Sequence, residues 1–206
     1  MKLSASEWPA ERVRAWTTAL ETLATAGEAA VAATGKRDLM ASTADALAGA
    51  FADWVIVDLA PAGQGSRSVA GRLSRPELAA AVAQLPIADC PLTISAMDQR
   101  TPLVQAEIAD TSELGILPDG QRVADALGAG SYAVSPITAC GRALGAITIV
   151  RNRSRPPVTF VELNVLAHIA DLAAAAIERL DSRGELVHAS QNGRSHDGPD
   201  PPRPLA

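Results

Sequence analysis

Few side chains in this sequence combine in a way that could carry out chemistry. Its cysteines, Cys90 and Cys140, stand far apart, and no CxxC or HxxxH spacing is present to form a metal site. A thiol at Cys90 could ligate a metal, attach a chromophore or respond to oxidants, but it could equally serve as a small buried filler. Cys140 falls in a predicted hairpin turn and is assigned no role. Because no catalytic constellation is visible, we expect a protein that is not an enzyme.

His168 is the only histidine before the C-terminal segment. At helical spacing it shares a polar stripe with Asn164, Asp171 and Glu178, opposite an apolar face. We therefore interpret His168 as a solvated residue near Asp171 and not as a haem ligand.

The composition argues against several classes of function. Hydrophobic residues make up 48% of the chain, and the formal net charge is −5 without a basic run, so we expect no binding to nucleic acid. Apolar stretches are interrupted by charge or proline, and the opening MKLSASEW has no apolar core like that of a signal peptide. We therefore expect a cytoplasmic protein without a membrane partner.

The alternation of apolar residues predicts an α+β domain. A β-branched run bounded by turns predicts a strand at 53–59, with its hairpin partner at 66–72, and two further strands are predicted at 131–137 and 144–151. The last two are joined as a hairpin through TACGRA. A capping box at Thr159 and Glu162 opens a closing helix that ends near Leu180.

The middle of the chain, from 86 to 117, is harder to interpret. Prolines at 86, 91 and 102 interrupt its pattern, and one strand near 103–108 is the only regular element that we predict there. A short helix at 118–127 follows and is stopped by glycine.

Strand alternation sorts the side chains of the predicted sheet into two faces. One face is bulky and suits helices packed on it: Val55, Val57, Leu59, Tyr132, Val134, Ile147 and Ile149. The other carries small and polar groups that leave space for a ligand: Trp54, Ile56, Asp58, Ala133, Ser135, Ala146 and Thr148. Together with Cys90, this second face is our predicted ligand-binding site. The alternative is a close-packed covering segment without any cavity.

The predicted helices offer apolar seams for association. Between 6 and 34, apolar residues recur at spacings of three and four: Val13, Trp16, Leu20, Leu23, Gly27 and Ala30. In the closing helix, four alanines at 173–176 permit close approach of another helix. We predict that these helices pair between two copies to form a homodimer, although packing within one chain would satisfy both seams equally.

The order of these elements resembles the GAF family of sensory domains. The run DWVIVDL at 53–59 is similar to the family's first strand. The run GSYAVSPI at 130–137, followed by CGRALGAITIV at 140–150, is similar to its terminal hairpin. The closing helix also fits, and the resemblance covers residues 37 to 181.

The resemblance implies a central antiparallel sheet of about five to six strands, with N- and C-terminal helices on one face and short helices and loops over the other. It also implies an unidentified small-molecule ligand beneath that cover. The chain leaves no room for a catalytic output domain, so we expect a signal to pass through the terminal helices to a separate signalling protein.

No cofactor follows from the resemblance. The cysteine and histidine attachment pair of bilin-binding relatives is missing, and no lysine after Lys36 is present to complete the site of cyclic-nucleotide-binding relatives. Free methionine sulfoxide reductases are GAF-like enzymes with several cysteines around the pocket, and we do not expect their activity from a chain with two.

We divide the chain into an N-terminal helix at 1–36 for dimerisation and signalling, a GAF-like domain at 37–182 and a disordered tail at 183–206. The tail is rich in Gly, Ser, Asp and Pro and cannot bury enough apolar surface to fold. The leading hypothesis is a non-catalytic small-molecule sensor. A pocketless dimerisation or scaffold protein is the alternative, and a redox or haem-dependent enzyme is a third hypothesis.

Overall fold

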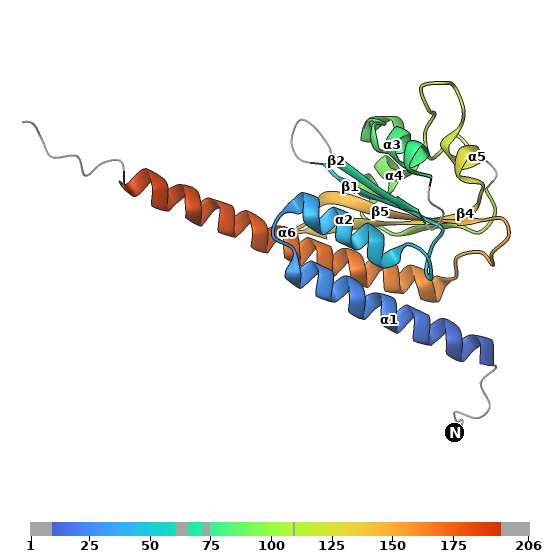
Figure 1. Cartoon of the computed structure of the whole chain (residues 1–206), viewed down its shortest axis with the longest axis horizontal. Coiled ribbons are helices and arrows are strands. Elements are labelled where there is room, and N and C mark those ends of the chain that lie inside the picture. Colours follow the sequence, from blue (N-terminus) through green and yellow to red (C-terminus); the bar gives the residue numbers. More distant parts are fainter. Residues whose placement is uncertain (1–9, 61–65, 72–74, 109, 195–206) are drawn as a thin grey trace, which may run out of the picture.

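The β-branched runs of the sequence form the antiparallel sheet on which this protein is built (Figure 1). The computed structural model describes residues 10–60, 66–71, 75–108 and 110–194. Within them, the strands are β1 (Trp54–Leu59), β2 (Ser66–Gly71), β3 (Leu103–Gln105), β4 (Ala129–Ala139) and β5 (Arg142–Asn152). They lie in the order β2-β1-β5-β4-β3, and every neighbouring pair is antiparallel.

Helices cover both faces of this sheet (Figure 1). One face carries α1 (Ala10–Ala32), α2 (Lys36–Leu47) and α6 (Phe160–Arg194). The opposite face carries α3 (Pro76–Ala83), the 3-10 helix η2 (Ile87–Asp89), α4 (Pro91–Gln99) and α5 (Val123–Leu127), and we call this layer, residues 75–102, 106–108 and 110–127, the roof. A five-stranded antiparallel sheet with the terminal helices on one face confirms the predicted α+β architecture.

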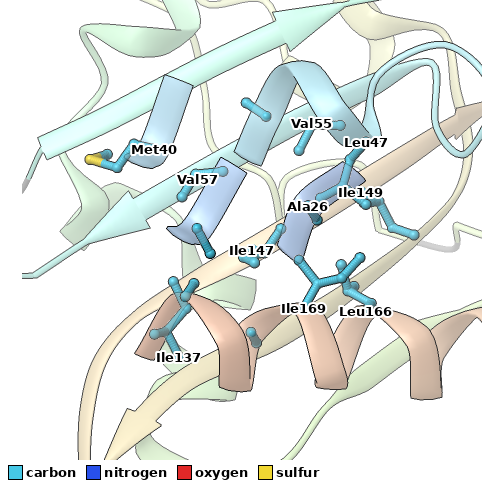
Figure 2. Close-up of a cluster of buried hydrophobic side chains, with 14 of the residues drawn as sticks. Ala26, Met40, Leu47, Val55, Val57, Ile137, Ile147, Ile149, Leu166 and Ile169 are labelled. Atoms are coloured by element: carbon cyan, nitrogen blue, oxygen red, sulfur yellow. The ribbon is translucent and has the colours of Figure 1, made fainter. Parts of the chain in front are cut away.

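The main hydrophobic core lies between the sheet and the terminal helices. Figure 2 shows aliphatic side chains of β1 and β5 meeting those of α2 and α6, with Val55, Val57, Ile147, Ile149, Leu166 and Ile169 among them. Helix α1 approaches this layer through small residues, since Ala19, Ala26 and Ala30 are almost fully buried. Small side chains let helix axes come close, which is how a chain with few aromatic residues packs its core.

The hairpin between β4 and β5 carries a one-residue bulge. Cys140 and Gly141 form its two-residue turn with φ of 49° and 74°, and positive φ at both positions is the requirement of a type I′ turn. Thr138 pairs with Ala143, whereas Ile137 pairs with Gly145, so Leu144 is an extra residue on β5. From that point on, the pairing of the two strands is shifted by one residue.

The roof contains a helix that the sequence did not predict. Helix α4 lies inside the segment interpreted as irregular, and Pro91, which suggested a break, occupies its first turn, where proline is tolerated. The predicted strand at 103–108 is confirmed only as the three residues of β3, and the helix predicted at 118–127 begins at Val123. In the roof, Pro76 and Pro91 therefore mark the starts of helices α3 and α4.

Helix α6 begins at the predicted capping box and ends later than expected. The Glu162 carboxylate accepts hydrogen bonds from the Thr159 N–H and hydroxyl, each at 2.8 Å, which confirms the box. The helix continues to Arg194, so the prediction of disorder was wrong for 183–194, while 195–206 lie outside the described residues. One glycine, Gly184, costs only about 1 kcal/mol within a helix and does not end it.

By length and composition, Phe160–Glu185 of α6 could also cross a membrane, with a mean hydropathy of 1.6. Half of that window is buried within the fold, where α6 packs on the sheet and against α1. A core helix has the same composition, and we interpret α6 as one.

Candidate functional site

The predicted ligand-binding residues do not all lie on one face of the sheet. Trp54, Ile56 and Ala146 belong to a second hydrophobic cluster beneath the roof, together with Val82, Leu92, Leu117 and Leu127. Thr148 stands opposite Ile56 and therefore shares this face. Its hydroxyl is buried and has no hydrogen-bond partner among the described residues. These four predicted residues point toward the roof, as expected.

Ala133 and Ser135, in contrast, point toward the terminal helices, and their predicted position beneath the roof was wrong. Ala133 pairs with Ile149 and Ser135 pairs with Ile147, both of which are in the helical core. The bulge at Leu144 is the reason, because a shift of one residue moves every side chain of a strand to the other face. The same shift brings Tyr132 and Val134 beneath the roof, where the sequence prediction did not have them.

Asp58 and Cys90 come together through an arginine that the sequence reasoning missed. Arg67 of β2 stands directly opposite Asp58 of β1 and donates to both carboxylate oxygens, at 2.6 and 3.0 Å. The same guanidinium donates to the Cys90 sulfur at 3.2 Å, and the Thr93 hydroxyl donates to Asp58 at 3.4 Å. A register for the β1–β2 hairpin would have found Arg67, because cross-strand partners are the nearest neighbours in a sheet.

This polar network fastens the roof to the sheet. Side-chain exposure is 0% for Asp58 and 3% for Arg67, so the pair is fully removed from water. Arg67 also donates to the Val82 carbonyl of α3 at 3.4 Å, and the Cys90 thiol donates to the Leu114 carbonyl at 3.5 Å. Asp58 and Cys90, which were both predicted to bind a ligand, are therefore bound by Arg67 of the same chain.

Burial and charge act against each other in this network. Burial alone would lower the pKa of Arg67, but the Asp58 carboxylate outweighs it and raises that pKa. Burial raises the pKa of Asp58, although the hydrogen bonds from Arg67 and Thr93 oppose the rise. The raised pKa of Arg67 favours a charged pair, whereas the raised pKa of Asp58 favours a neutral carboxyl. We assign the ionic form, because both carboxylate oxygens of Asp58 accept hydrogen bonds from Arg67.

The two thiols are in environments that disfavour the thiolate. Burial raises the pKa of Cys90, and Arg67 offsets only part of the rise. Cys140, at the exposed hairpin turn, contacts a Glu178 carboxylate oxygen at 3.3 Å, and this hydrogen bond raises the pKa of Cys140 as well. Both cysteines are free, and neither has the lowered pKa of a reactive thiol.

On the β4–β3 side of the sheet, the roof leaves a cavity of about 350 Å³ between α4, β3 and β4, which we call the roof cavity. Its walls are formed by Pro91, Leu92, Ser95, Leu103, Val104, Gln105, Glu113 and Tyr132. Tyr132 is 1% exposed, and neither its hydroxyl nor Oε2 of Glu113 has a hydrogen-bond partner in the described part of the chain. Sequence reasoning missed these residues, because their convergence depends on the β4 register and on α4.

On the helical side, Arg151 joins the sheet to the start of α6. Its buried side chain donates to the Phe51 carbonyl at 3.1 and 2.9 Å and to both carboxylate oxygens of Glu162. Burial alone would raise the pKa of Glu162, but hydrogen bonds from Arg151 and Thr159 hold it below its ordinary value. The end of β5 and the first turn of α6 are thereby linked as one unit.

A groove of about 740 Å³ opens next to this link, between α1 and residues 156–162. Trp16 and Ala15 of α1, Phe51 and Val161 are among its walls. His168 lies on the exposed side of α6, 3.9 Å from Asp171, and this confirms that it is a solvated residue. Among the described residues, no group of three or more His, Cys, Asp or Glu could hold a metal ion.

Comparison with known proteins identifies the fold. The GAF domain family model matches residues 17–177. The free methionine-R-sulfoxide reductase from Neisseria meningitidis, in complex with its substrate, is similar with a TM-score of 0.60 and 18% identity, over 80% of this chain and 91% of that one. No curated protein sequence matches.

Two further solved structures are similar. The GAF domain of a phosphoenolpyruvate-protein phosphotransferase from Coxiella burnetii gives a TM-score of 0.59 and 16% identity, over 82% of this chain and 98% of that one. The GAF-B domain of DevS from Mycobacterium smegmatis gives a TM-score of 0.50 and 24% identity, over 72% of this chain and 94% of that one. At these identities the likeness establishes the fold alone.

The buried ion pair yields a first prediction. Asp58→Asn leaves the Arg67 charge without its counter-ion, and removing one partner of a buried pair costs about 3–5 kcal/mol. We expect urea denaturation to show a loss of this size for Asp58→Asn. The double variant Asp58→Leu/Arg67→Met should recover most of it, because apolar residues can replace a buried pair. A double variant as unstable as Asp58→Asn would contradict an ionic pair.

A second prediction concerns Glu162, whose folded pKa is lowered. Its ionised form stabilises the fold above the ordinary pKa of 4.5, and this contribution is lost as pH falls through the lower folded value. Glu162→Gln should therefore be destabilised at neutral pH, by an amount that shrinks toward zero on acidification. Urea denaturation between neutral and acid pH measures this difference. The exposed Glu185→Gln should match the unsubstituted protein throughout, and a Glu162→Gln deficit independent of pH would contradict the assignment.

Proposed function

The chain belongs to the GAF family, and from this premise we propose that it is a non-catalytic sensory module that binds a small molecule in the roof cavity. The signal then passes through α1 and α6 to a separate partner protein. Tyr132 lines this cavity, and the observation that carries the proposal is its buried hydroxyl, which has no hydrogen-bond partner among the described residues. A buried polar group without a partner lowers stability, and a ligand that completes its hydrogen bonds would recover that free energy.

A short path connects the cavity with the terminal helices. Ser131 precedes Tyr132 in β4 and points to the opposite face, where its hydroxyl accepts a hydrogen bond from the Val158 N–H at 3.2 Å. Val158 lies just before α6, whose first turn Arg151 holds through Glu162. A ligand that shifts β4 at Tyr132 would therefore shift the start of α6. Such coupling requires two states with different ligand affinity.

A homodimer through α1 is part of this proposal. The predicted seam divides in the structure, because Ala30 packs within the chain while Val13, Trp16 and Leu20 are 45%, 41% and 59% exposed. Of the alanine run in α6, residues 173, 174 and 176 are buried within the chain, so our use of that run as a dimer seam was wrong. The exposed seam leaves an apolar face for a second copy.

That face extends onto α6 and includes the groove. Gly27 of α1 lies against Leu172 of α6, which is 38% exposed, and Val161 is 40% exposed. In a two-fold dimer, the same surface of each copy forms the interface, so Trp16 of each copy can enter the apolar groove of the other. Beyond the sheet, the distal half of α6 projects away from the domain (Figure 1) and provides an output helix.

The other hypotheses receive less support. The hydrogen bonds among Asp58, Arg67 and Cys90 leave no pocket above β1 and β2 and so favour a pocketless scaffold, but they leave the roof cavity unexplained. Reductase chemistry needs an accessible thiolate, whereas Cys90 is 3% exposed with a raised pKa. The net charge of −5 supports the proposal that no nucleic acid is a partner. We further propose a cytoplasmic protein without a membrane partner.

Native mass spectrometry of the full chain, followed by thermal shift with a metabolite panel, tests the sensory function. We expect a bound small molecule or at least one compound that raises the melting temperature, because a ligand at a hundred times its Kd adds about 2.7 kcal/mol. The same compound should change hydrogen exchange in residues 156–162, where the path to α6 runs. Bare protein that no compound stabilises would favour the scaffold hypothesis.

Sedimentation equilibrium tests the dimer. Leu20→Asp adds a charge to the centre of the exposed seam, so we expect it to convert the dimer to monomer without loss of folding. Thr25→Asp adds the same charge to an exposed position on another side of α1 and should remain dimeric. An unsubstituted chain that is monomeric at all concentrations, or a Leu20→Asp chain that is still dimeric, would overturn this interface.

A further inference from the structure

The only formal charge in the described lining of the roof cavity is negative. Among its lining residues in the described chain, Glu113 is the only one that carries a full charge at neutral pH, and no lysine, arginine or histidine stands with it. Leu92, Leu103 and Val104 supply apolar walls, and Ser95, Gln105 and Tyr132 supply neutral polar groups. A ligand for this cavity has to complement a carboxylate among apolar walls and neutral polar groups.

One oxygen of the Glu113 carboxylate accepts no hydrogen bond in the described part of the chain. Its Oε2 is buried and has no hydrogen bond within the described residues. Burial raises the pKa of Glu113, and the nearby Asp110 carboxylate raises it further. A cation beside Glu113 would relieve both effects, because an opposite charge within a few ångströms favours the ionised form.

The position of Glu113 is fixed by the roof and not by a loose loop. Its carbonyl accepts a hydrogen bond from the Leu92 N–H of α4 at 3.1 Å. The next carbonyl, of Leu114, accepts from the Cys90 thiol, which the Arg67 network holds in turn. The polar network on the β1–β2 side of the sheet thus fixes the backbone that carries Glu113, so the cavity is formed before a ligand arrives.

Tyr132 provides the second polar group. It is buried to 1% exposure, its hydroxyl has no partner in the described part of the chain, and it stands opposite Gln105 on β3. A phenol both donates and accepts hydrogen bonds, so it can serve an N–H group or a neighbouring ligand oxygen.

We propose that the roof cavity binds a small organic ammonium: a primary or secondary amine on a compact apolar body. Glu113 accepts an N–H hydrogen bond and supplies the counter-charge, Tyr132 accepts a second hydrogen bond, and the aliphatic walls enclose the carbon skeleton. This inference rests on the proposed sensory function and names the chemical class of its ligand. An anion would meet Glu113 without any basic residue to offset the repulsion, and a neutral alcohol would leave the carboxylate charge unpaired.

Calorimetric titration of the full chain tests this class of ligand with matched probes. Benzylamine, 2-phenylethylamine and cyclohexylmethylamine serve as cations, and benzyl alcohol and benzoate serve as neutral and anionic counterparts of benzylamine. We expect at least one amine to bind more tightly than the alcohol and benzoate not to bind. Glu113→Gln should weaken the amine at least about tenfold, as expected for a charge-assisted hydrogen bond. Glu107→Gln, an exposed substitution of the same kind in the same segment, should leave binding unchanged.

The possible failures separate this inference from the proposed function. Equal binding of amine and alcohol, no binding by any of the three amines, or full binding by Glu113→Gln would each overturn the ammonium site. An anionic molecule found by native mass spectrometry would also overturn it, while sensory binding itself would stand. If the chain carries no adduct and no metabolite stabilises it, the sensory function fails as well.

Stability provides a readout that needs no ligand. If the Tyr132 hydroxyl is kept for a ligand, Tyr132→Phe removes an unpaired buried group and should leave the free energy of unfolding equal or higher. The same variant should weaken amine binding several-fold. A marked loss of stability in Tyr132→Phe with unchanged amine binding would mean that the hydroxyl serves the fold, and this would remove Tyr132 from the site.

Discussion

The pairing register of β4 and β5 is the constraint on which the rest of this structure depends. A single extra residue, Leu144, shifts that register by one position just after the hairpin turn. The shift turns Tyr132 toward the roof and Ser135 toward the terminal helices. Both the hydrophobic core and the roof cavity follow from it, because the side chains of a strand alternate strictly between its faces.

Buried polar groups divide the space beneath the roof into two regions. On the β1–β2 side of the sheet, Asp58 and Arg67 satisfy each other and close the position where a ligand was expected. On the β4–β3 side, Tyr132 and Glu113 line a cavity, and each has a buried polar atom without a hydrogen-bond partner among the described residues. Hydrogen bonds are made in the first region and missing in the second. Because unpaired buried groups lower stability, we interpret the second region as a site kept for a ligand.

Strand β4 also connects the two sides of the sheet. Tyr132 faces the cavity, and its neighbour Ser131 holds the chain just before α6 through the Val158 N–H. On the helical side, α1 contributes alanines to the core and leaves bulky residues such as Trp16 outside. The family match, which begins at residue 17 within α1, agrees with this helix being part of the packed domain.

The sequence by itself determined the α+β architecture, the capping box at Thr159 and the segments that form strands, because these depend on local spacing and side-chain preference. Trp54, Ile56 and Thr148 could be assigned to the roof face from simple alternation. Only the tertiary structure decided which residues face one another. A bulge, the β1–β2 register that pairs Arg67 with Asp58, and a helix beginning at Pro91 are set by long-range packing, which local patterns do not encode.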